Sequence, residues 1–348
     1  MKFNWKSAAI SVAGACAVLL CTVPASSSAE TFRVYVSNEQ DGTLSVISGD
    51  TLEKIATIPV GRRPRGVRPS PDGKLLYVAL SGSPMAGPKV DEKTLPPPDR
   101  AQDGIGILDL EQGGKLVRVL RGVPDPEQVG ISLDGKTLYV ASEDSARVFV
   151  LDARDGTIRA EVDAGGEPEG VRISPDGRLV LVTAEAGNSV ALMNASSHDL
   201  LATIPVGLRP RDVVFSPDSK FAYVSGEADA SVSKLDVASR KVVSKVTIKG
   251  QKMMPMALAL SADGKNLFLS TGRGGEIVAL DAGTLAEEGR AKVGPRPWGI
   301  ALSPDDKLLF AANGPSNNVS VLKTDRLEVV KTIAAGAHPW GVTVVATP

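Results

Sequence analysis

The sequence predicts an all-β protein, a seven-bladed β-propeller with four antiparallel strands per blade. Two recurring phrases predict this fold. A serine-x-aspartate phrase occurs six times, and its serines are 62, 42, 42, 45 and 42 residues apart. The last four intervals match the period of propeller blades. These serines are Ser70, Ser132, Ser174, Ser216, Ser261 and Ser303. A phrase headed by proline occurs seven times, at Pro64, Pro126, Pro168, Pro210, Pro255, Pro297 and Pro339.

The first 29 residues have the pattern of an export signal. Lys2 and Lys6 precede an apolar run at 8–23, and small residues follow it as far as Ala29. The apolar run is short for a membrane span of about 20 residues, which disfavours a retained anchor. We therefore expect cleavage near Ala29, a periplasmic or secreted protein, and a single propeller domain over 30–348.

The unequal number of the two phrases predicts how the ring closes. After Pro339 the chain has room for one strand only, at 340–346. Three further strands are expected near the N-terminus, at 32–38, 43–47 and 54–60. We expect them to join the C-terminal strand in one blade, because an open ring would expose two sheet edges.

One blade departs from the common period. The first interval between serines holds about twenty extra residues, an insertion loop over about 81–102. Its run of three prolines at 96–98 favours an extended conformation that suits contact with a partner. The loop is a candidate cap or docking element, and a tolerated insertion without function is the alternative.

The third repeat shows how one blade is built. Residues 170–174 alternate apolar and polar, and residues 175–177 form a proline–aspartate–glycine turn. Residues 179–183 form an apolar run typical of a strand packed on both faces. Two further strands are expected at 189–193 and 201–206, which completes four strands joined by tight turns.

Composition excludes several classes of partner and site. Both cysteines lie in the expected signal, so the mature chain can form neither a disulfide nor a cysteine–metal site. Without Lys2 and Lys6, the chain keeps 37 basic residues against 40 acidic ones. This balance favours neither nucleic acid nor membrane association after removal of the signal. We expect a monomer without cofactor or metal.

Tyr35-Val36-Ser37-Asn38 and its weaker copies at 139–142 and 223–226 resemble the tyrosine-valine-threonine-asparagine (YVTN) family of propeller repeats. The resemblance covers nearly the whole mature chain, and it implies the propeller fold. Seven repeats behind an export signal are also similar to propeller proteins associated with pyrroloquinoline quinone-dependent alcohol catabolism. That similarity implies an accessory role in alcohol oxidation or transport.

Connectivity predicts where a site would lie. The loop entering each innermost strand and the loop joining the second and third strands emerge on one face, opposite the aspartate–glycine turns. The proline phrases therefore surround one mouth of the central channel, the default ligand site of such a scaffold. The candidate ligand- or partner-binding residues at this mouth are Arg62, Arg63, Arg65, Arg209, Arg211, Arg296, Trp298, His338 and Trp340.

These side chains suit particular ligands. Arginines bind anions or an acidic patch on a partner, and paired tryptophans stack on a flat ring or a cation. Two structural interpretations stay open: the tryptophans fill the channel, or the arginines pair with Glu127, Glu167 and Glu169. The methionines of the stretch 252–256 suggest a soft metal site, although filling gaps in the core is favoured.

The sequence displays no constellation of catalytic residues. We therefore expect a non-catalytic exported propeller that binds a small ligand or a partner protein at the mouth. The alternative is a lactonase-like hydrolase or a haem-handling protein that uses His338, the imidazole at the mouth. Glu127, Glu169 and Asp212 are the carboxylates that would join it in such a site.

Overall fold

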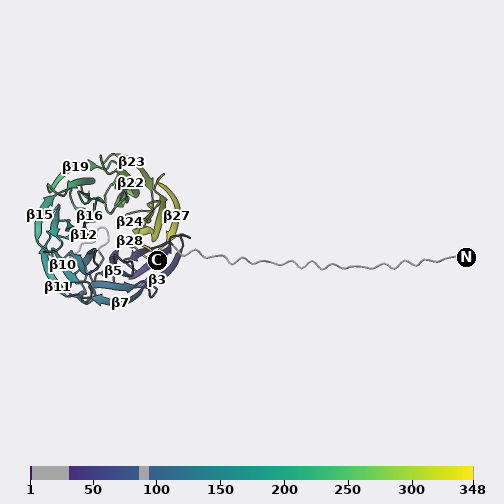
Figure 1. The fold of residues 1–348 in the computed structure, drawn as a ribbon, viewed down its shortest axis with the longest axis horizontal. Helices are drawn as coiled ribbons and strands as arrows, with labels where there is room; N and C mark the ends of the chain where they lie inside the picture. Colours follow the sequence, from purple (N-terminus) through teal and green to yellow (C-terminus); the bar gives the residue numbers. More distant parts are fainter. Residues whose placement is uncertain (2–30, 86–93, 348) are drawn as a thin grey trace.

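The fold is a closed ring of seven four-stranded antiparallel sheets, as predicted (Figure 1). The computed structural model describes Met1 and residues 31–85 and 94–347. Residues 2–29 of the predicted signal at 1–29, with the expected cleavage site, lie outside these residues. No helix among the described residues is long and apolar enough to span a membrane.

The blades are numbered in chain order, and each is given from its innermost to its outermost strand. Blade 1 contains β4 (Pro64–Pro69), β5 (Leu75–Leu80), β6 (Gly104–Asp109) and β7 (Lys115–Leu120). Blade 2 contains β8 (Pro126–Ile131), β9 (Thr137–Ser142), β10 (Arg147–Asp152) and β11 (Ile158–Asp163). Blade 3 contains β12 (Pro168–Ile173), β13 (Leu179–Ala184), β14 (Ser189–Asn194) and β15 (Leu200–Pro205).

The remaining blades repeat this order. Blade 4 contains β16 (Pro210–Phe215), β17 (Phe221–Gly226), β18 (Ser231–Asp236) and β19 (Lys241–Thr247). Blade 5 contains β20 (Leu258–Leu260), β21 (Asn266–Ser270), β22 (Glu276–Asp281) and β23 (Glu287–Lys292). Blade 6 contains β24 (Pro297–Leu302), β25 (Leu308–Asn313), β26 (Asn318–Lys323) and β27 (Glu328–Ala334). Within the described ranges, the loops contain the 3-10 helices η2 (Arg100–Gln102), η3 (Gly272–Gly274) and η4 (Gly314–Ser316).

Blade 7 closes the ring in the predicted way. Its innermost strand is β28 (Pro339–Ala346), followed by β1 (Phe32–Asn38), β2 (Thr43–Ser48) and β3 (Lys54–Pro59). Strands β1 and β28 are antiparallel, with Val34 opposite Val344. The two ends of the described chain therefore share one sheet, whose bounds differ from the expected ones by one residue.

The serine-x-aspartate phrases form the turns between the first two strands of blades 1 to 6. In blade 3, Ser174 Oγ donates to Asp176 Oδ1 at 2.6 Å and accepts from the backbone N–H of Leu179 at 2.9 Å. The hydrogen bond from Ser174, together with the backbone N–H of Arg178, lowers the pKa of Asp176. The other five copies make the same pair of contacts. The phrase is a turn that its own side chains stabilise.

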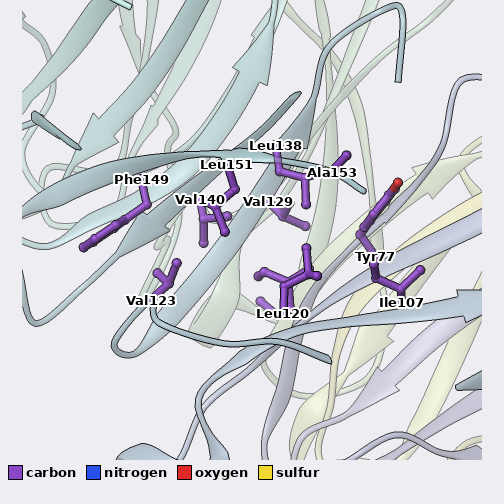
Figure 2. Close-up of a cluster of buried hydrophobic side chains, with 12 residues drawn as sticks. Tyr77, Ile107, Leu120, Val123, Val129, Leu138, Val140, Phe149, Leu151 and Ala153 are labelled. Carbon is purple, nitrogen blue, oxygen red and sulfur yellow. The ribbon is translucent and has the colours of Figure 1, made fainter. Parts of the chain in front are cut away.

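The core consists of seven apolar clusters. Figure 2 shows the cluster between blades 1 and 2, where Tyr77 and Ile107 meet Val129, Leu138 and other side chains of the next blade. No blade can bury both of its faces alone, so this packing couples each blade to the next.

Glycines let the innermost strands converge on the axis. A Cβ on Gly341 of β28 would lie 2.5 Å from the backbone oxygen of Arg65 in β4. One on Gly299 of β24 would lie 2.6 Å from the backbone oxygen of Trp340. These contacts support the structural interpretation of the repeated glycine, because any larger residue would push the strands apart.

Candidate functional site

The second residue of each proline phrase forms a ring around one mouth of the channel. In order from blade 1 to blade 7, these residues are Arg65, Glu127, Glu169, Arg211, Met256, Trp298 and Trp340. Each innermost strand contacts the innermost strands of both neighbouring blades, so neighbours in this order are also neighbours in space. The mouth thus has a charged half in blades 1 to 4 and a largely apolar half in blades 5 to 7.

The residue before the proline has a strained backbone in six of the seven phrases. These six residues have positive φ angles between 40° and 56°: Arg63, Asp125, Glu167, Arg209, Arg296 and His338. The helical conformation is disfavoured before proline, and the left-handed conformation costs about 1–3 kcal/mol for a non-glycine residue. These strained residues lie where the chain passes from the outermost strand of one blade to the innermost strand of the next, beside the channel.

Arg65 is the centre of the first charged cluster. Its Nε lies 3.3 Å from Glu39 Oε1, its Nη1 lies 3.2 Å from Glu143 Oε2, and it forms an ion pair with Glu127. Arg63 Nε donates to Glu39 Oε1 at 2.8 Å. Burial alone would raise the pKa of Glu39, but the two guanidinium groups lower it below its usual value. Glu39 is therefore a fixed carboxylate.

Arg211 is the centre of the second charged cluster. Its Nη1 lies 2.6 Å from Glu169 Oε2, its Nη2 lies 2.6 Å from Glu227 Oε2, and it forms an ion pair with Glu185. Burial raises the pKa of Glu169 well above its usual value despite Arg211, and the negative charge of Glu185 raises it further. Glu169 therefore holds its proton more tightly than an ordinary glutamate.

The opposite half of the mouth is aromatic. The rings of Trp298 and Trp340 stack with their centroids 5.7 Å apart and their planes at 29°. The guanidinium of Arg296 lies 4.8 Å from the centroid of Trp298, and that of Arg211 lies 6.0 Å from it. Burial and the charge of Arg273 lower the pKa of Arg296. Arg211 thus connects the charged half of the mouth to the aromatic half.

His338 lies beside the tryptophans. A Cβ on Gly314 would lie 3.5 Å from both His338 Nδ1 and Trp298 Cδ1, which places the imidazole and the indole around one glycine. The backbone N–H of His338 donates to Asn317 Oδ1 at 3.0 Å, and its carbonyl accepts from the N–H of Glu39 at 2.9 Å. The imidazole is partly exposed, so it is accessible from the mouth.

The structure brings most of the predicted site residues together. Arg63, Arg65, Arg209 and Arg211 are in the charged half, and Arg296, Trp298, His338 and Trp340 are in the aromatic half. Arg62 is exposed in the loop before β4. Whether these residues bind a ligand stays a prediction.

Two other predicted features have structural roles. Asp212 is buried, forms an ion pair with Arg172 at 3.0 Å and accepts from the backbone N–H of Leu258 at 3.1 Å. It therefore supports β20, the short innermost strand of blade 5. Met253 and Met256 are buried, and Met253 packs in the cluster between blades 4 and 5. Filling of the core accounts for these two methionines.

The described part of the 81–102 insertion joins β5 to β6 on the mouth face. Asp103 Oδ1 accepts from the backbone N–H of Gly82 at 2.6 Å, and Arg100 Nη1 lies 3.0 Å from Asp103 Oδ2. Arg63 Nη1 donates to the carbonyl of Ser83 at 3.4 Å. Both ends of the insertion are therefore fixed beside the first charged cluster.

Four glutamates at the mouth were missed from the sequence. Glu39, Glu143, Glu185 and Glu227 each follow the last residue of a second strand, in the loop that faces the mouth. Three of them follow the copies of the Tyr-Val phrase, after Asn38, Ser142 and Gly226. The repeated glutamate at one position of the period is the signal that would have found them.

Among the described residues, no three histidine, cysteine, aspartate or glutamate side chains form a group able to hold a metal ion. The mouth is nonetheless rich in proton donors and acceptors. The partly exposed carboxylate of Glu143 lies 3.2 Å from Arg65, and the buried carboxyl group of Glu169 lies 2.6 Å from Arg211. The stacked tryptophans are on the other side of the ring. Such a set can orient a polar ring and transfer protons at its edge.

Comparisons with known proteins name two families. A family model described as "Lactonase, 7-bladed beta-propeller" matches residues 200–332, and one described as "Cytochrome D1 heme domain" matches residues 128–212. No curated protein matches the chain.

Solved structures with this fold include enzymes. The periplasmic gluconolactonase PpgL of Pseudomonas aeruginosa is 22% identical, with a TM-score of 0.73 over 91% of this chain and 99% of its own. A putative 6-phosphogluconolactonase of Bacteroides fragilis is 20% identical, with a TM-score of 0.73 over 92% of this chain and 99% of its own. Dihydro-heme d1 dehydrogenase NirN is 18% identical, with a TM-score of 0.63 over 89% of this chain and 74% of its own.

The chain is thus a seven-bladed β-propeller that resembles propellers of the lactonase type. The expectation of a non-catalytic binding protein is wrong, because both family models and the similar enzyme structures favour the lactonase-like or haem-handling alternative. The expectation of a non-catalytic protein was made without four of the carboxylates at the mouth, Glu39, Glu143, Glu185 and Glu227. The comparisons name neither YVTN repeats nor quinone-linked proteins, so those two assignments are not supported by them.

Proposed function

We propose that this protein is a lactonase-like hydrolase that opens a sugar lactone at the channel mouth. The observation that carries this proposal is the buried Glu169 carboxyl, whose pKa is raised, 2.6 Å from Arg211 and opposite the stacked tryptophans. The match of residues 200–332 to the lactonase family supports it.

The arrangement assigns a role to each group in the hydrolysis of a cyclic ester. Water attacks the carbonyl carbon, and Glu143, whose side chain is 35% exposed, accepts the proton that this water loses. Arg211 and Arg296 stabilise the oxyanion formed on the carbonyl oxygen. Protonated Glu169 donates its proton to the ring oxygen as the carbon–oxygen bond breaks. The products are a hydroxyl group and a carboxylic acid.

The apolar half of the mouth positions the substrate. The carbon–hydrogen face of a sugar ring packs on an indole, and its hydroxyl groups need charged partners around its edge. Trp298, stacked on the buried Trp340, provides the first surface, and the two arginine clusters provide the second. An aldonolactone is therefore the substrate class that these side chains suit.

The test is hydrolysis of glucono-1,5-lactone, followed as acid release and corrected for the spontaneous reaction. We expect Glu169→Gln and Arg211→Lys each to lower kcat/KM about 100-fold, the usual effect of losing an acid or an oxyanion donor. Glu111→Gln is the control, because Glu111 pairs with Lys74 on the opposite face. Equal rates for wild type and buffer, or an unchanged Glu169→Gln variant, would overturn the proposal.

A haem-handling function is the second candidate, and the position of His338 beside Trp298 favours it. A bound tetrapyrrole would supply redox chemistry. The imidazole of His338 would hold its iron, and Arg296 would pair with an acidic substituent of the ring. Haem uptake, read as a shift of its absorption band that is lost in His338→Ala, would identify this function in a protein without lactonase activity.

We further propose a periplasmic location. The export-signal pattern at 1–29 supports it, as does the similarity to a periplasmic gluconolactonase. Fractionation of the native cells tests the proposal, because the protein should be released with the periplasmic contents.

A further inference from the structure

A cleft of about 610 Å³ lies between blades 1 and 2, on the face of the serine-x-aspartate turns and away from the proposed active site. Its floor is apolar and includes Leu75, Tyr77 and Ile107. Figure 2 shows Tyr77 and Ile107 together at one end of the apolar cluster, with the Tyr77 hydroxyl directed away from the other side chains. The volume falls in the range of pockets that hold small organic ligands.

Tyr77 differs from its repeat equivalents in this cleft. The hydroxyl of Tyr139 in blade 2 donates to the carbonyl of Ala195 in blade 3 at 2.7 Å. The hydroxyl of Tyr223 in blade 4 likewise donates to the carbonyl of Ala282 in blade 5 at 2.8 Å. Tyr77 is only 2% exposed, yet its hydroxyl makes no hydrogen bond with any described residue. Tyr77 lines the cleft, and its oxygen is not among the fully buried side-chain atoms without a partner, so the hydroxyl is open to a ligand there.

The rim of the cleft is cationic. Arg118, Lys136, Arg154 and Arg159 line it, together with one acidic residue, Asp152. Three of these cations have carboxylate partners: Lys136 pairs with Asp134, Arg154 with Asp155 and Arg159 with Asp152.

Arg118 is the exception. It donates to the carbonyl of Arg154, and no ion pair of Arg118 occurs among the described residues. One uncompensated positive charge therefore stands above an apolar floor that contains one unpartnered hydroxyl donor.

We propose that this cleft binds an amphipathic carboxylate, with its head between Arg118 and the Tyr77 hydroxyl and its apolar body along Leu75, Ile107 and Val117. A guanidinium and a carboxylate form charge-assisted hydrogen bonds, and one uncompensated cation matches one negative charge. Val117 is 46% exposed, so the ligand would also cover apolar surface that now faces water.

The Tyr77 hydroxyl is a suitable donor for this head group. Burial raises the pKa of Tyr77, so the hydroxyl stays neutral and keeps its proton at neutral pH. A carboxylate oxygen would accept this proton and would satisfy the unpartnered hydroxyl group. An uncharged alcohol of the same length would leave Arg118 unpaired.

Calorimetric titration of the whole protein with decanoate tests the proposal. We expect decanoate to bind at least about tenfold more tightly than decanol, the difference expected for one charge-assisted contact. Arg118→Gln should weaken decanoate binding about tenfold, and Tyr77→Phe about fivefold. Arg118 is on an outer strand and the Tyr77 hydroxyl has no partner, so both variants should fold.

Tyr139→Phe is the matched control, because it removes an equivalent hydroxyl that does not line this cleft. It should leave decanoate binding unchanged. Equal binding of decanol and decanoate, or unchanged binding in Arg118→Gln, would overturn the proposal. Tighter binding of decyl phosphate than of decanoate would overturn the choice of a carboxylate head. Lactone hydrolysis should be the same in all these variants, so the result is independent of the proposed active site.

Discussion

Arg65 and Arg211 have similar surroundings, yet their carboxylates titrate differently. Each guanidinium meets three glutamates, so one positive charge faces three negative ones. Glu39 also contacts Arg63, whose side chain is 13% exposed, and this second buried cation lowers the Glu39 pKa. Among the described residues, Glu169 pairs with Arg211 alone, and it is fully buried. Burial and the negative charge of Glu185 therefore raise its pKa despite that one guanidinium.

The raised pKa of Glu169 predicts a particular dependence of stability on pH. Its stabilising contribution is complete below the unfolded pKa of 4.5 and is lost as the pH rises through the higher folded pKa. Glu169→Gln stays neutral at every pH. We expect the free energy of unfolding of wild type to fall relative to this variant by about 1 kcal/mol or more between pH 5 and 8. Urea unfolding at several pH values measures this difference, and parallel curves for the two proteins would contradict it.

The innermost strands are the elements whose spacing sets the shape of the mouth. The glycine at the third position of the proline phrase lets neighbouring strands approach closely. Where blade 4 has Asp212 instead, its carboxylate holds the backbone of the shortened β20. Backbone contact therefore sets the spacing of some innermost strands, and the buried side chain of Asp212 sets the spacing of β16 and β20.

Gly341→Ala should lower the free energy of unfolding by about 2–4 kcal/mol, because the added methyl group meets the backbone of β4 rather than a flexible side chain. Gly283→Ala is the control, since the nearest atom to its Cβ is a side-chain oxygen of Asp281 at 3.2 Å, in an exposed turn. Thermal and urea unfolding give both values. Equal effects of the two substitutions would show that the close approach at Gly341 is unimportant.

At the scale of the whole molecule, stability depends on closure by β28. This strand pairs with β1, contacts β4 and β24, and buries Trp340, Val342 and Val345. It connects the first blade to the last one, and it also carries part of the aromatic half of the mouth. Closure of the ring and assembly of the site are therefore one event.

Truncation after Gly336 should cost about 5 kcal/mol or more, since three large buried side chains are lost and the edge of β1 is exposed. We expect the truncated protein to aggregate, which light scattering and circular dichroism would detect. Deletion of Pro348 alone is the control and should leave both signals unchanged. A soluble, cooperatively folded protein without β28 would contradict the role of closure.

The sequence alone was sufficient to predict the architecture. Its period of about 42 residues gave the number of blades, and the unmatched seventh proline phrase gave the closure in blade 7. The same period placed Arg65, Arg211, Trp298 and Trp340 at equivalent positions, because each blade repeats one local pattern of strands and turns.

Only the tertiary structure decided what those positions do. Glu39 and Glu185 recur at one position of the repeat, but only the ring brings them to Arg65 and Arg211 in neighbouring blades. The pKa of Glu169 depends on burial, and the absence of a hydrogen-bond partner for the Tyr77 hydroxyl among the described residues depends on how blades 1 and 2 pack together. The repeat pattern can be recognised from the sequence, because it is local. The mouth arginines and glutamates come together and become buried only when the ring closes.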